Sequence, residues 1–278
     1  MTNLAIIIVS HNTRADLDRC LRSLHDNPPK VSHEIVVVDN ASCDGSSDLV
    51  RRRWPAIRLI ESSQNVGFAR GNNLGIRETR STLVLLLNSD TFVPAGMIDA
   101  LVSDLDAHAD TAAIGPRLVD ASHRAELSFG AMMRPWSEVW QKAVRRLADR
   151  DVGIAVRWID RATRRPRIVD WISGACLLVR RDDAEAVGLL DERYFIYCED
   201  VDFCAALRAR GRRIRFSPIA EITHVRGRSV ATAPSATEAA YRRSQLSFYE
   251  KHHPGWLPWL KAYLRLRGKL PAQTADNT

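Results

Sequence analysis

The chain has 278 residues, of which 45% are hydrophobic and 26% are charged, enough to bury the core of one large α/β domain or two small ones. No apolar run approaches the roughly 20 residues that span a bilayer, the N-terminal sequence lacks a signal peptide's basic region and cleavage site, and the five cysteines have no CxxC spacing. These features argue against a membrane-spanning protein, a disulfide framework and a zinc site, and they favour a cytoplasmic location of the protein. The net charge of +7 favours an anionic partner, namely nucleic acid, a phosphorylated small molecule or an anionic membrane surface.

The first 120 residues are predicted to alternate strands with helices. Apolar runs typical of buried strands occur at 4–10, 33–42, 56–62 and 82–90, and a shorter strand is expected over 111–120. Strands separated by helical segments of this length predict a mostly parallel sheet with helices on both faces. One helix is expected directly after Asn12-Thr13, and three more are expected within 44–54, 65–79 and 93–108.

The second half is less regular. Residues 132–168 are rich in arginine and tryptophan and predict one or two helices with a mobile loop. Regular patterning resumes with a strand and helix over 168–192 and a helix within 194–211. Two short strands, RRIRFSP and EITHVRG, and a helix over 235–252 follow.

The tail, 254–270, predicts a basic amphipathic helix. One stripe carries Trp256, Trp259, Leu260, Tyr263 and Leu264, with lysines and arginines around it. Such a helix can lie in an anionic membrane interface, and the alternative is a helix that packs on the main domain.

Three predicted strands end in polar residues, namely Ser10/Asn12, Asp39/Asn40 and Asn88/Asp90. Because parallel sheets bind ligands beyond the carboxyl ends of their strands, these residues are expected to face one crevice. Asp39 could hydrogen-bond a base or a ribose hydroxyl, and Ser89 with Asp90 could offer oxygen ligands to Mg²⁺ or Mn²⁺. For each acid the alternative is a cap on the next helix.

The segment NVGFARGNNLG, residues 65–75, is a glycine-rich turn that enters a helix. It matches neither the P-loop nor the dinucleotide-binding fingerprint. Its backbone amides and Arg70 could hold phosphate, or its glycines could permit close packing of the helix on the sheet.

Two further sites could carry chemistry. Glu199 and Asp200 begin a helix after the aromatic run YFIYC, where Asp200 could serve as a general base, although acids are common at helix N-termini. His224 follows a predicted strand, where a lone histidine is more often structural than a ligand.

Together these motifs resemble those of the family 2 glycosyltransferases, which have the GT-A fold, and within them the bacterial rhamnosyltransferase-like members. The resemblance covers about residues 4–230 in the family's order. The matching stretches are IIIVSHN, IVVVDNASCDGS, NVGFARGNNLGI, LLLNSD, VDWISGACLLVRR, FIYCEDVDFCAALRARG and ITHVRGRS.

The resemblance implies roles for individual residues. Asp90 and His224 would hold the metal, Asp200 would be the catalytic base, and Asn88 replaces the first acid of the family's DxD motif, which puts the strength of metal binding in doubt. Contacts with the nucleotide-diphosphate are implied for Ser10, Asn12, Asp39, Asn40, Asn65, Arg70, Asn88 and Ser89. Contacts with the acceptor are implied for Trp171, Ser173, Gly174 and Glu199.

The resemblance also implies an organisation. Residues 1–120 would form the nucleotide-sugar-binding half and 121–230 the acceptor-binding and catalytic half of one Rossmann-like GT-A domain, with a basic mobile segment at 132–168 and a C-terminal helical extension at 231–278.

The function that follows is an inverting transfer of a deoxyhexose, best L-rhamnose from dTDP-rhamnose, to a glycan or polyprenyl-diphosphate-linked precursor, assisted by Mg²⁺ or Mn²⁺. The enzyme would act in the cytoplasm or peripherally on the inner membrane. The alternatives are a transferase that uses a UDP- or GDP-sugar, a sugar nucleotidyltransferase, a basic nucleic-acid-binding module without any of the usual motifs, and an inactive relative.

Overall fold

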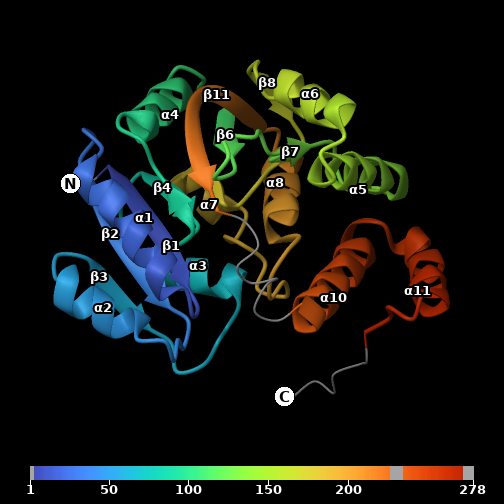
Figure 1. Ribbon diagram of the computed structural model, residues 1–278, viewed down its shortest axis with the longest axis horizontal. Helices are drawn as coiled ribbons and strands as arrows, with labels where there is room; N and C mark the ends of the chain where they lie inside the picture. The colour runs from blue at the N-terminus through green and yellow to red at the C-terminus, as the bar shows by residue number, and fades with distance from the viewer. Residues whose placement is uncertain (1–2, 226–233, 272–278) are drawn as a thin grey trace.

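The computed structural model describes residues 3–225 and 234–271, which fold around one large mixed sheet (Figure 1). In the described part of the chain this sheet has nine strands, ordered β3-β2-β1-β4-β10-β6-β11-β5, with β8 paired to β11. Its strands are β1 (Leu4–Ser10), β2 (His33–Asp39), β3 (Arg58–Glu61), β4 (Leu83–Leu87), β5 (Thr91–Phe92), β6 (Thr111–Val119), β8 (Arg167–Val169), β10 (Cys176–Arg180) and β11 (Arg213–His224). A second, two-stranded sheet pairs β7 (Phe129–Gly130) with β9 (Trp171–Ile172).

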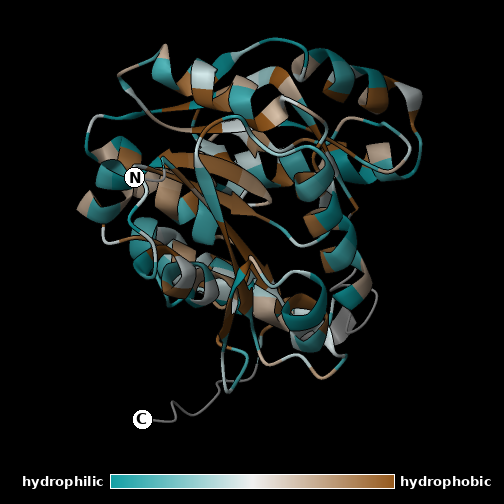
Figure 2. Cartoon of the chain, turned by 90° about the vertical axis from the view of Figure 1, so that its left-hand side faces the viewer, coloured by the Kyte–Doolittle hydropathy of each residue, from teal (hydrophilic) through white to brown (hydrophobic). Residues whose placement is uncertain are grey.

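Apolar layers on both faces of the sheet hold the fold together. Leu17 and Leu21 of α1 (Arg14–Asp26) pack in one layer, and Phe203 of α8 (Glu199–Ala209) packs in the other. Each such buried side chain contributes about 1.5–3 kcal/mol, so the sheet is a firm support for residues at its edge. Figure 2 shows the mostly hydrophobic strands between helices whose residues alternate between hydrophilic and hydrophobic. The other helices that cover the sheet are α2 (Ser46–Arg53), α3 (Phe68–Arg77), α4 (Met97–Asp106) and α7 (Arg181–Ala186).

Strands β3, β2, β1 and β4 run parallel, as the apolar runs predict. Ser10 at the end of β1 lies opposite Asp39 at the end of β2, and Asn88 follows the end of β4. The three polar strand ends therefore meet at one edge of the sheet, which confirms the predicted GT-A-like, mostly parallel arrangement with flanking helices.

The second half of the sheet differs from the prediction in its details. The segment 168–192 is not one strand and a helix, because β8, β9 and β10 precede α7, and β10 runs antiparallel between β4 and β6. The two short strands expected near residue 220 are one strand, β11, whose pairing with β6 shifts register between Ser217 and Glu221. Such an irregularity lets a strand continue past extra residues. Strand β6 has nine residues and is not short.

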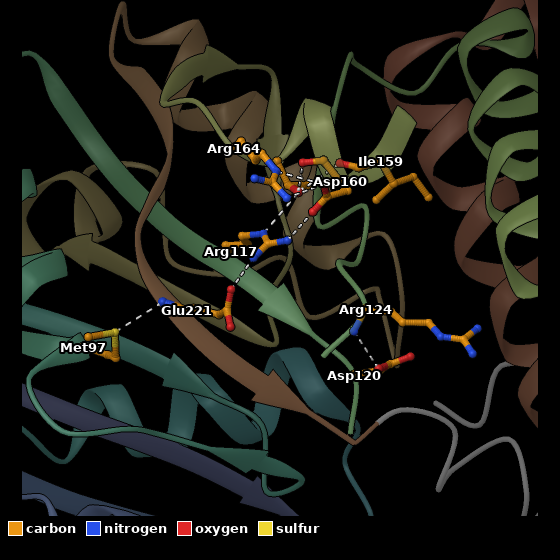
Figure 3. Close-up of polar contacts among 9 residues, drawn as sticks. Met97, Arg117, Asp120, Arg124, Ile159, Asp160, Arg164 and Glu221 are labelled. Atoms are coloured by element: carbon orange, nitrogen blue, oxygen red, sulfur yellow. Dashed lines mark hydrogen bonds and ion pairs between the residues drawn. The ribbon is translucent and has the colours of Figure 1, made fainter. Parts of the chain in front are cut away.

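Residues 132–168 form two helices, α5 (Pro135–Asp149) and α6 (Gly153–Ala162), which pack on each other. The expected helices are confirmed, and the mobility of the segment stays a prediction. Figure 3 shows how α6 is attached to the sheet: the Arg117 guanidinium lies between Glu221 of β11 and Asp160 of α6, with 2.8 Å from its Nη2 to Asp160 Oδ1.

The C-terminal part consists of α10 (Pro234–His252), a short 3-10 helix η1 (Pro254–Trp256) and α11 (Leu257–Leu266). Leu264 of α11 is fully buried, whereas Trp259 and Tyr263 are exposed, so the predicted apolar stripe is divided between a packed side and an outer side. Within the described ranges, no helix combines the length and the apolar character that crossing a membrane requires. The last part of the ITHVRGRS motif, from residue 226, lies outside the described residues, and the division of the chain at residue 120 stays a prediction.

The α10 helix is held to α5 by a buried carboxylate. Glu138 of α5 accepts hydrogen bonds from the hydroxyls of Tyr241 (2.8 Å) and Tyr249 (3.0 Å) and from the Gln245 carboxamide of α10. It also pairs with Lys142 one turn further along α5. Burial works against ionisation of Glu138, but the charge and hydrogen bond of Lys142 and the α10 donors lower its pKa below the usual value.

Candidate active site

A cavity of about 490 Å³ lies beyond the end of β4 and beside the start of α8. Eight of the residues predicted from the sequence to form a site line it together. They are Asn88, Asp90, Trp171, Ser173, Gly174, Glu199, Asp200 and His224. The candidate metal ligands, the candidate base and the candidate acceptor residues therefore share one space, although they come from four separate segments of the chain.

Asp90 and His224 meet because of strand pairing. Asp90 precedes the short strand β5, and β5 pairs with β11 so that Thr91 lies opposite His224. The Nε2 atom of His224 lies 3.3 Å from Asp90 Oδ1, and its Nδ1 lies 3.2 Å from Glu126 Oε2. Burial alone would lower the histidine pKa, but hydrogen bonds and charges of the two carboxylates raise the pKa of His224 to about 9.

The side-chain atoms at this point could ligate a divalent cation whose remaining coordination positions are filled by a substrate. Among the described residues, no group of three or more histidine, cysteine, aspartate or glutamate side chains is arranged to hold a metal ion by itself. Asp90 and His224 offer one carboxylate and one imidazole, and the Asn88 carboxamide lies 3.3 Å from His224 Nε2. Mg²⁺ and Mn²⁺ commonly bind through one or two protein ligands plus waters and substrate phosphates, so a diphosphate is the group that fits the remaining positions.

Asp200 stands at the N-terminus of α8 in a fixed orientation. Its Oδ2 accepts the backbone N–H of Gly174 at 3.0 Å, and its Oδ1 accepts that of Val201 at 2.8 Å. A Cβ atom at Gly174 would lie 3.3 Å from the Phe68 ring and 3.5 Å from the Asp200 Cβ, so the absence of a side chain permits this close approach. Burial raises the pKa of Asp200 above its usual value, although the two amide hydrogen bonds oppose the rise.

Glu199 is buried beside Asp200, and its Oε2 has no hydrogen-bond partner within the described part of the chain. Burial and the charge of Asp200 raise the pKa of Glu199 well above its usual value. A strongly perturbed pair of carboxylates in a cavity is typical of a catalytic site.

The predicted nucleotide-side residues lie at the neighbouring strand ends, and apart from Asn88 they do not line this cavity. The Ser10, Thr13 and Ser89 hydroxyls form a chain, with oxygen separations of 2.8 and 3.0 Å, that joins the ends of β1 and β4. Asp39 is buried, and its Oδ2 accepts the backbone N–H of Ser42. Its Oδ1 has no hydrogen-bond partner among the residues described, which leaves one acceptor for a ligand.

Three of the four predicted asparagines at this edge, Asn12, Asn40 and Asn65, shape the backbone. The Asn40 carboxamide donates to Asn65 Oδ1 at 2.9 Å and accepts from the Val66 N–H at 2.9 Å. Asn65 Oδ1 also accepts the Gly67 N–H at 3.0 Å. Asn12, which has a positive φ of 54°, accepts the Cys43 N–H at 2.8 Å. These bonds fix the loops that surround the strand ends.

Arg70 lies on the outer side of α3. Its Nε is 3.7 Å from Glu192 Oε2, and its side chain is 55% exposed. Arg70 therefore pairs with a carboxylate that is distant in the sequence, and its side chain does not line the cavity.

On the acceptor side, Trp171 donates its Nε1–H to the Ala131 carbonyl at 2.9 Å, and the Ser173 N–H bonds the Ser128 carbonyl at 2.8 Å. The cavity is also lined by residues that the sequence does not single out. Glu126, Glu138, Lys142, Arg145 and Tyr241 belong to this set, whereas Tyr197 comes from the aromatic run YFIYC that is expected to enclose a pocket beside Asp200. Helical spacing within 134–149 could have placed Lys142 and Arg145 on the same face as Glu138, but no local pattern distinguishes Glu126.

The model of the family described as "Glycosyl transferase family 2" matches residues 5–165, more than half of the chain. The chain belongs to glycosyl transferase family 2. It is therefore a glycosyltransferase, and the expectation from the resemblance is confirmed.

Curated relatives agree with this assignment. The chain is 29% identical to the N-acetylglucosaminyl-diphospho-decaprenol L-rhamnosyltransferase of Mycobacterium tuberculosis, over 98% of this chain and 94% of the relative. It is 27% identical to the low-salt glycan biosynthesis hexosyltransferase Agl10 of Haloferax volcanii, over 81% of this chain and 67% of the relative.

Solved structures share the fold. The mannosyltransferase PcManGT of Pyrobaculum calidifontis, in complex with GDP-Man and Mn²⁺, superposes with a TM-score of 0.61 at 18% identity, covering 95% of this chain and 69% of that one. Staphylococcus aureus TarS 1–349 in complex with UDP gives a TM-score of 0.59 at 14% identity, covering 95% and 72%. At these identities the likeness establishes the GT-A fold.

Proposed function

We propose that this glycosyltransferase moves L-rhamnose from dTDP-rhamnose to a polyprenyl-diphosphate-linked glycan precursor of a surface polysaccharide, with inversion at the anomeric carbon. The observation that carries the proposal is the cavity that brings Asp200, Asp90 and His224 together. The sugar and the lipid-linked acceptor are suggested by the mycobacterial relative, whose printed name contains both and which matches over nearly its whole length.

Asp200 acts as the general base. The acceptor hydroxyl gives its proton to the Asp200 carboxylate, its oxygen bonds to the anomeric carbon, and the bond from that carbon to the diphosphate oxygen breaks. The Gly174 and Val201 amides orient the carboxylate, and its raised pKa matches a base that must accept a proton near neutral pH. No covalent enzyme intermediate is needed, so a single carboxylate at the reacting hydroxyl is sufficient.

Asp90 and His224 would hold Mg²⁺ or Mn²⁺. When bound, the cation supplies a positive charge for the diphosphate as its negative charge grows. The pair lies on the β4 side of the cavity, as the metal end of the site requires. The free oxygen of Asp39 would accept a hydrogen bond from the base or the ribose, and Ser10, Asn12, Asn40, Asn65 and Ser89 would support the nucleotide from the neighbouring strand ends and loops. For Arg70 the role stays a prediction of the resemblance alone, because its side chain pairs with Glu192 on the outer side of α3.

The acceptor would enter on the α5 side of the cavity. Trp171, Ser173, Gly174 and Glu199 would contact its sugar. Lys142 and Arg145 of α5 also line this side. Arg145 supplies positive charge for an acceptor diphosphate, whereas the charge of Lys142 is balanced by its ion pair with Glu138. We further propose that the enzyme works at the cytoplasmic face of the inner membrane, where such an acceptor is embedded.

Thermal unfolding tests the donor and metal sites together. Wild type is measured with dTDP-, UDP- and GDP-sugars, each with Mg²⁺, Mn²⁺ or EDTA. A ligand at 100 times its dissociation constant should stabilise the protein by about 2.7 kcal/mol. The proposal expects a shift with dTDP-rhamnose that EDTA and Asp90→Ala abolish and that Asp149→Ala, an exposed acid on α5, preserves.

If only a UDP-sugar or only a GDP-sugar gives the thermal shift, that nucleotide and not dTDP would be assigned as the donor. No shift with any sugar nucleotide would contradict the proposed donor site. It would favour an inactive relative or a role outside sugar transfer.

A further inference from the structure

The exposed tryptophans of this chain lie on one part of its surface. The sequence has seven tryptophans, and Trp54 and Trp171 are buried. The five exposed ones are Trp136, Trp140, Trp158, Trp256 and Trp259, all on α5, α6, η1 and α11. Further exposed apolar side chains on the same elements are Val139, Leu147, Ile154, Tyr263 and Leu266. We call these ten residues the aromatic face.

Contacts between the helices make this face continuous. The Trp140 ring of α5 meets the Trp158 ring of α6 edge-on, with centroids 6.2 Å apart. The Trp136 ring of α5 meets Trp256 of η1 in the same way at 6.1 Å. Figure 1 places α5, α6 and α11 on the same side of the molecule. A continuous exposed apolar surface of this kind marks an interaction site.

The α5 helix has its polar and apolar sides the opposite way round from an ordinary surface helix. Three of its five charged residues, Glu138, Lys142 and Arg145, line the catalytic cavity, whereas Arg146 and Asp149 are exposed. Its large apolar residues point outward, and Trp136 and Trp140 are 60% and 57% exposed. Folding of this chain leaves these large apolar rings exposed to solvent and therefore does not account for their position.

Positive charge surrounds the aromatic face. No acidic residue occurs between positions 254 and 271, and Lys261, Arg265 and Arg267 of this stretch are exposed. On α6, Arg157 and Arg161 are exposed beside Ile154 and Trp158. The exposed acids nearest in sequence are Asp149 and Asp151, and Asp151 is paired with Arg124 at 3.0 Å.

We propose that the aromatic face docks on an anionic membrane surface, with its tryptophans at the level of the lipid headgroups. Tryptophan favours this zone because its ring is apolar and its N–H is polar, and lysine and arginine are attracted to anionic lipid. A second copy of the chain is a poorer occupant, because the basic residues of the two copies would face each other. Docking in this way puts the outer side of α5 on the lipid and the catalytic cavity on the other side of the same helix, whatever sugar is transferred.

Co-sedimentation with vesicles tests the proposal without donor or acceptor. Vesicles of phosphatidylcholine alone are compared with vesicles that also contain phosphatidylglycerol. Wild type is expected to bind the anionic vesicles, more weakly at high salt, with bromolipid quenching of its tryptophan fluorescence. The double variant Trp140→Ser/Trp259→Ser and the double variant Lys261→Glu/Arg265→Glu should each bind at least about tenfold more weakly.

Ile219→Ser is the matched control, because Ile219 is 61% exposed on β11 and is not part of the aromatic face. Its vesicle binding should equal that of wild type. All variants should keep the wild-type unfolding midpoint and the wild-type response to sugar nucleotides, so a loss of vesicle binding is separable from a failure of the donor site.

Three results would overturn the proposal. One is wild type that does not bind anionic vesicles. Another is an equal loss of binding in Ile219→Ser. The third is light scattering that finds a dimer which Trp140→Ser/Trp259→Ser dissociates, because a second copy would then cover the face.

Discussion

Replacing Asp200 with asparagine separates its proposed chemistry from its place in the fold. Asparagine has nearly the same size, and its one carbonyl oxygen can still accept either the Gly174 or the Val201 amide, which now lie 3.0 and 2.8 Å from the carboxylate. The second amide then faces an NH₂ group, which costs about 1–3 kcal/mol of stability. The folded state is expected to remain, with a lowered unfolding midpoint.

The catalytic cost should be larger. A general base contributes about 10²–10⁴ in rate, which corresponds to about 3–5 kcal/mol of transition-state stabilisation. We therefore expect kcat of Asp200→Asn to fall by at least about 100-fold in an assay of nucleoside diphosphate release. Donor binding, followed by the thermal shift, should stay near that of wild type, because Asp200 faces the acceptor hydroxyl in this account.

The pH profile gives an independent check. The base must be ionised, and burial raises the pKa of Asp200, so wild-type kcat/KM should rise with pH through a value above the usual aspartate range. The residual rate of Asp200→Asn should lack this rise. Glu199→Gln is the comparator: it replaces the neighbouring carboxyl group but keeps the base, so its loss should be within about tenfold and mainly in KM. An Asp200→Asn enzyme with more than about a tenth of the wild-type kcat would refute the assignment.

Three further changes have defined outcomes. Glu138→Gln removes the negative charge that binds Lys142 and the hydrogen-bond donors of α10. The free energy of unfolding measured in urea should fall by about 3–5 kcal/mol. A fall below about 1 kcal/mol would contradict the role of this network. Because the pKa of Glu138 is lowered in the folded state, its contribution is complete above the usual glutamate pKa and should disappear as the pH falls through the lowered value. Gly67→Ala should prevent folding or lower the stability measured by thermal unfolding several times more than Gly96→Ala does. Both glycines have positive φ, but a Cβ at Gly67 would lie 2.4 Å from the Phe195 carbonyl oxygen, whereas the space at Gly96 is open. Equal losses of stability would contradict this packing. Asn88→Asp puts a carboxylate at the position that now lies 3.3 Å from His224 Nε2. It should lower the Mn²⁺ concentration needed for the nucleotide-dependent thermal shift by about tenfold. An unchanged Mn²⁺ requirement would argue against a cation between Asp90 and His224.

The sequence alone supports the first half of the fold well. The apolar run at 83–87 forms the buried strand that its short length predicts, and the polar residues after β1, β2 and β4 meet at one edge because parallel strands end on the same side. The approach of His224 to Asp90 is less predictable, since it depends on the pairing of the two-residue strand β5 with β11. Only the family resemblance linked them.

Other features depend on distant partners that no local pattern reveals. Arg70 pairs with Glu192, more than 100 residues away, and Glu126 reaches His224 from the turn after β6. The unbroken β11 depends on a register shift against β6 that the sequence around Pro218 hides, because a proline there favours a strand end. The two-sided character of α5 becomes visible only when its charged residues are found in the cavity.

The measurement that tests the central claim most directly is transfer itself. Purified protein is incubated with Mn²⁺, dTDP-rhamnose labelled in the sugar, and a short-chain polyprenyl-diphosphate-linked N-acetylglucosamine, and the lipid product is isolated and its anomeric configuration determined. We expect a labelled, inverted product that EDTA abolishes and that Asp200→Asn reduces by at least about 100-fold. Label that stays on the nucleotide for every donor, or transfer at the wild-type rate by Asp200→Asn, would contradict it.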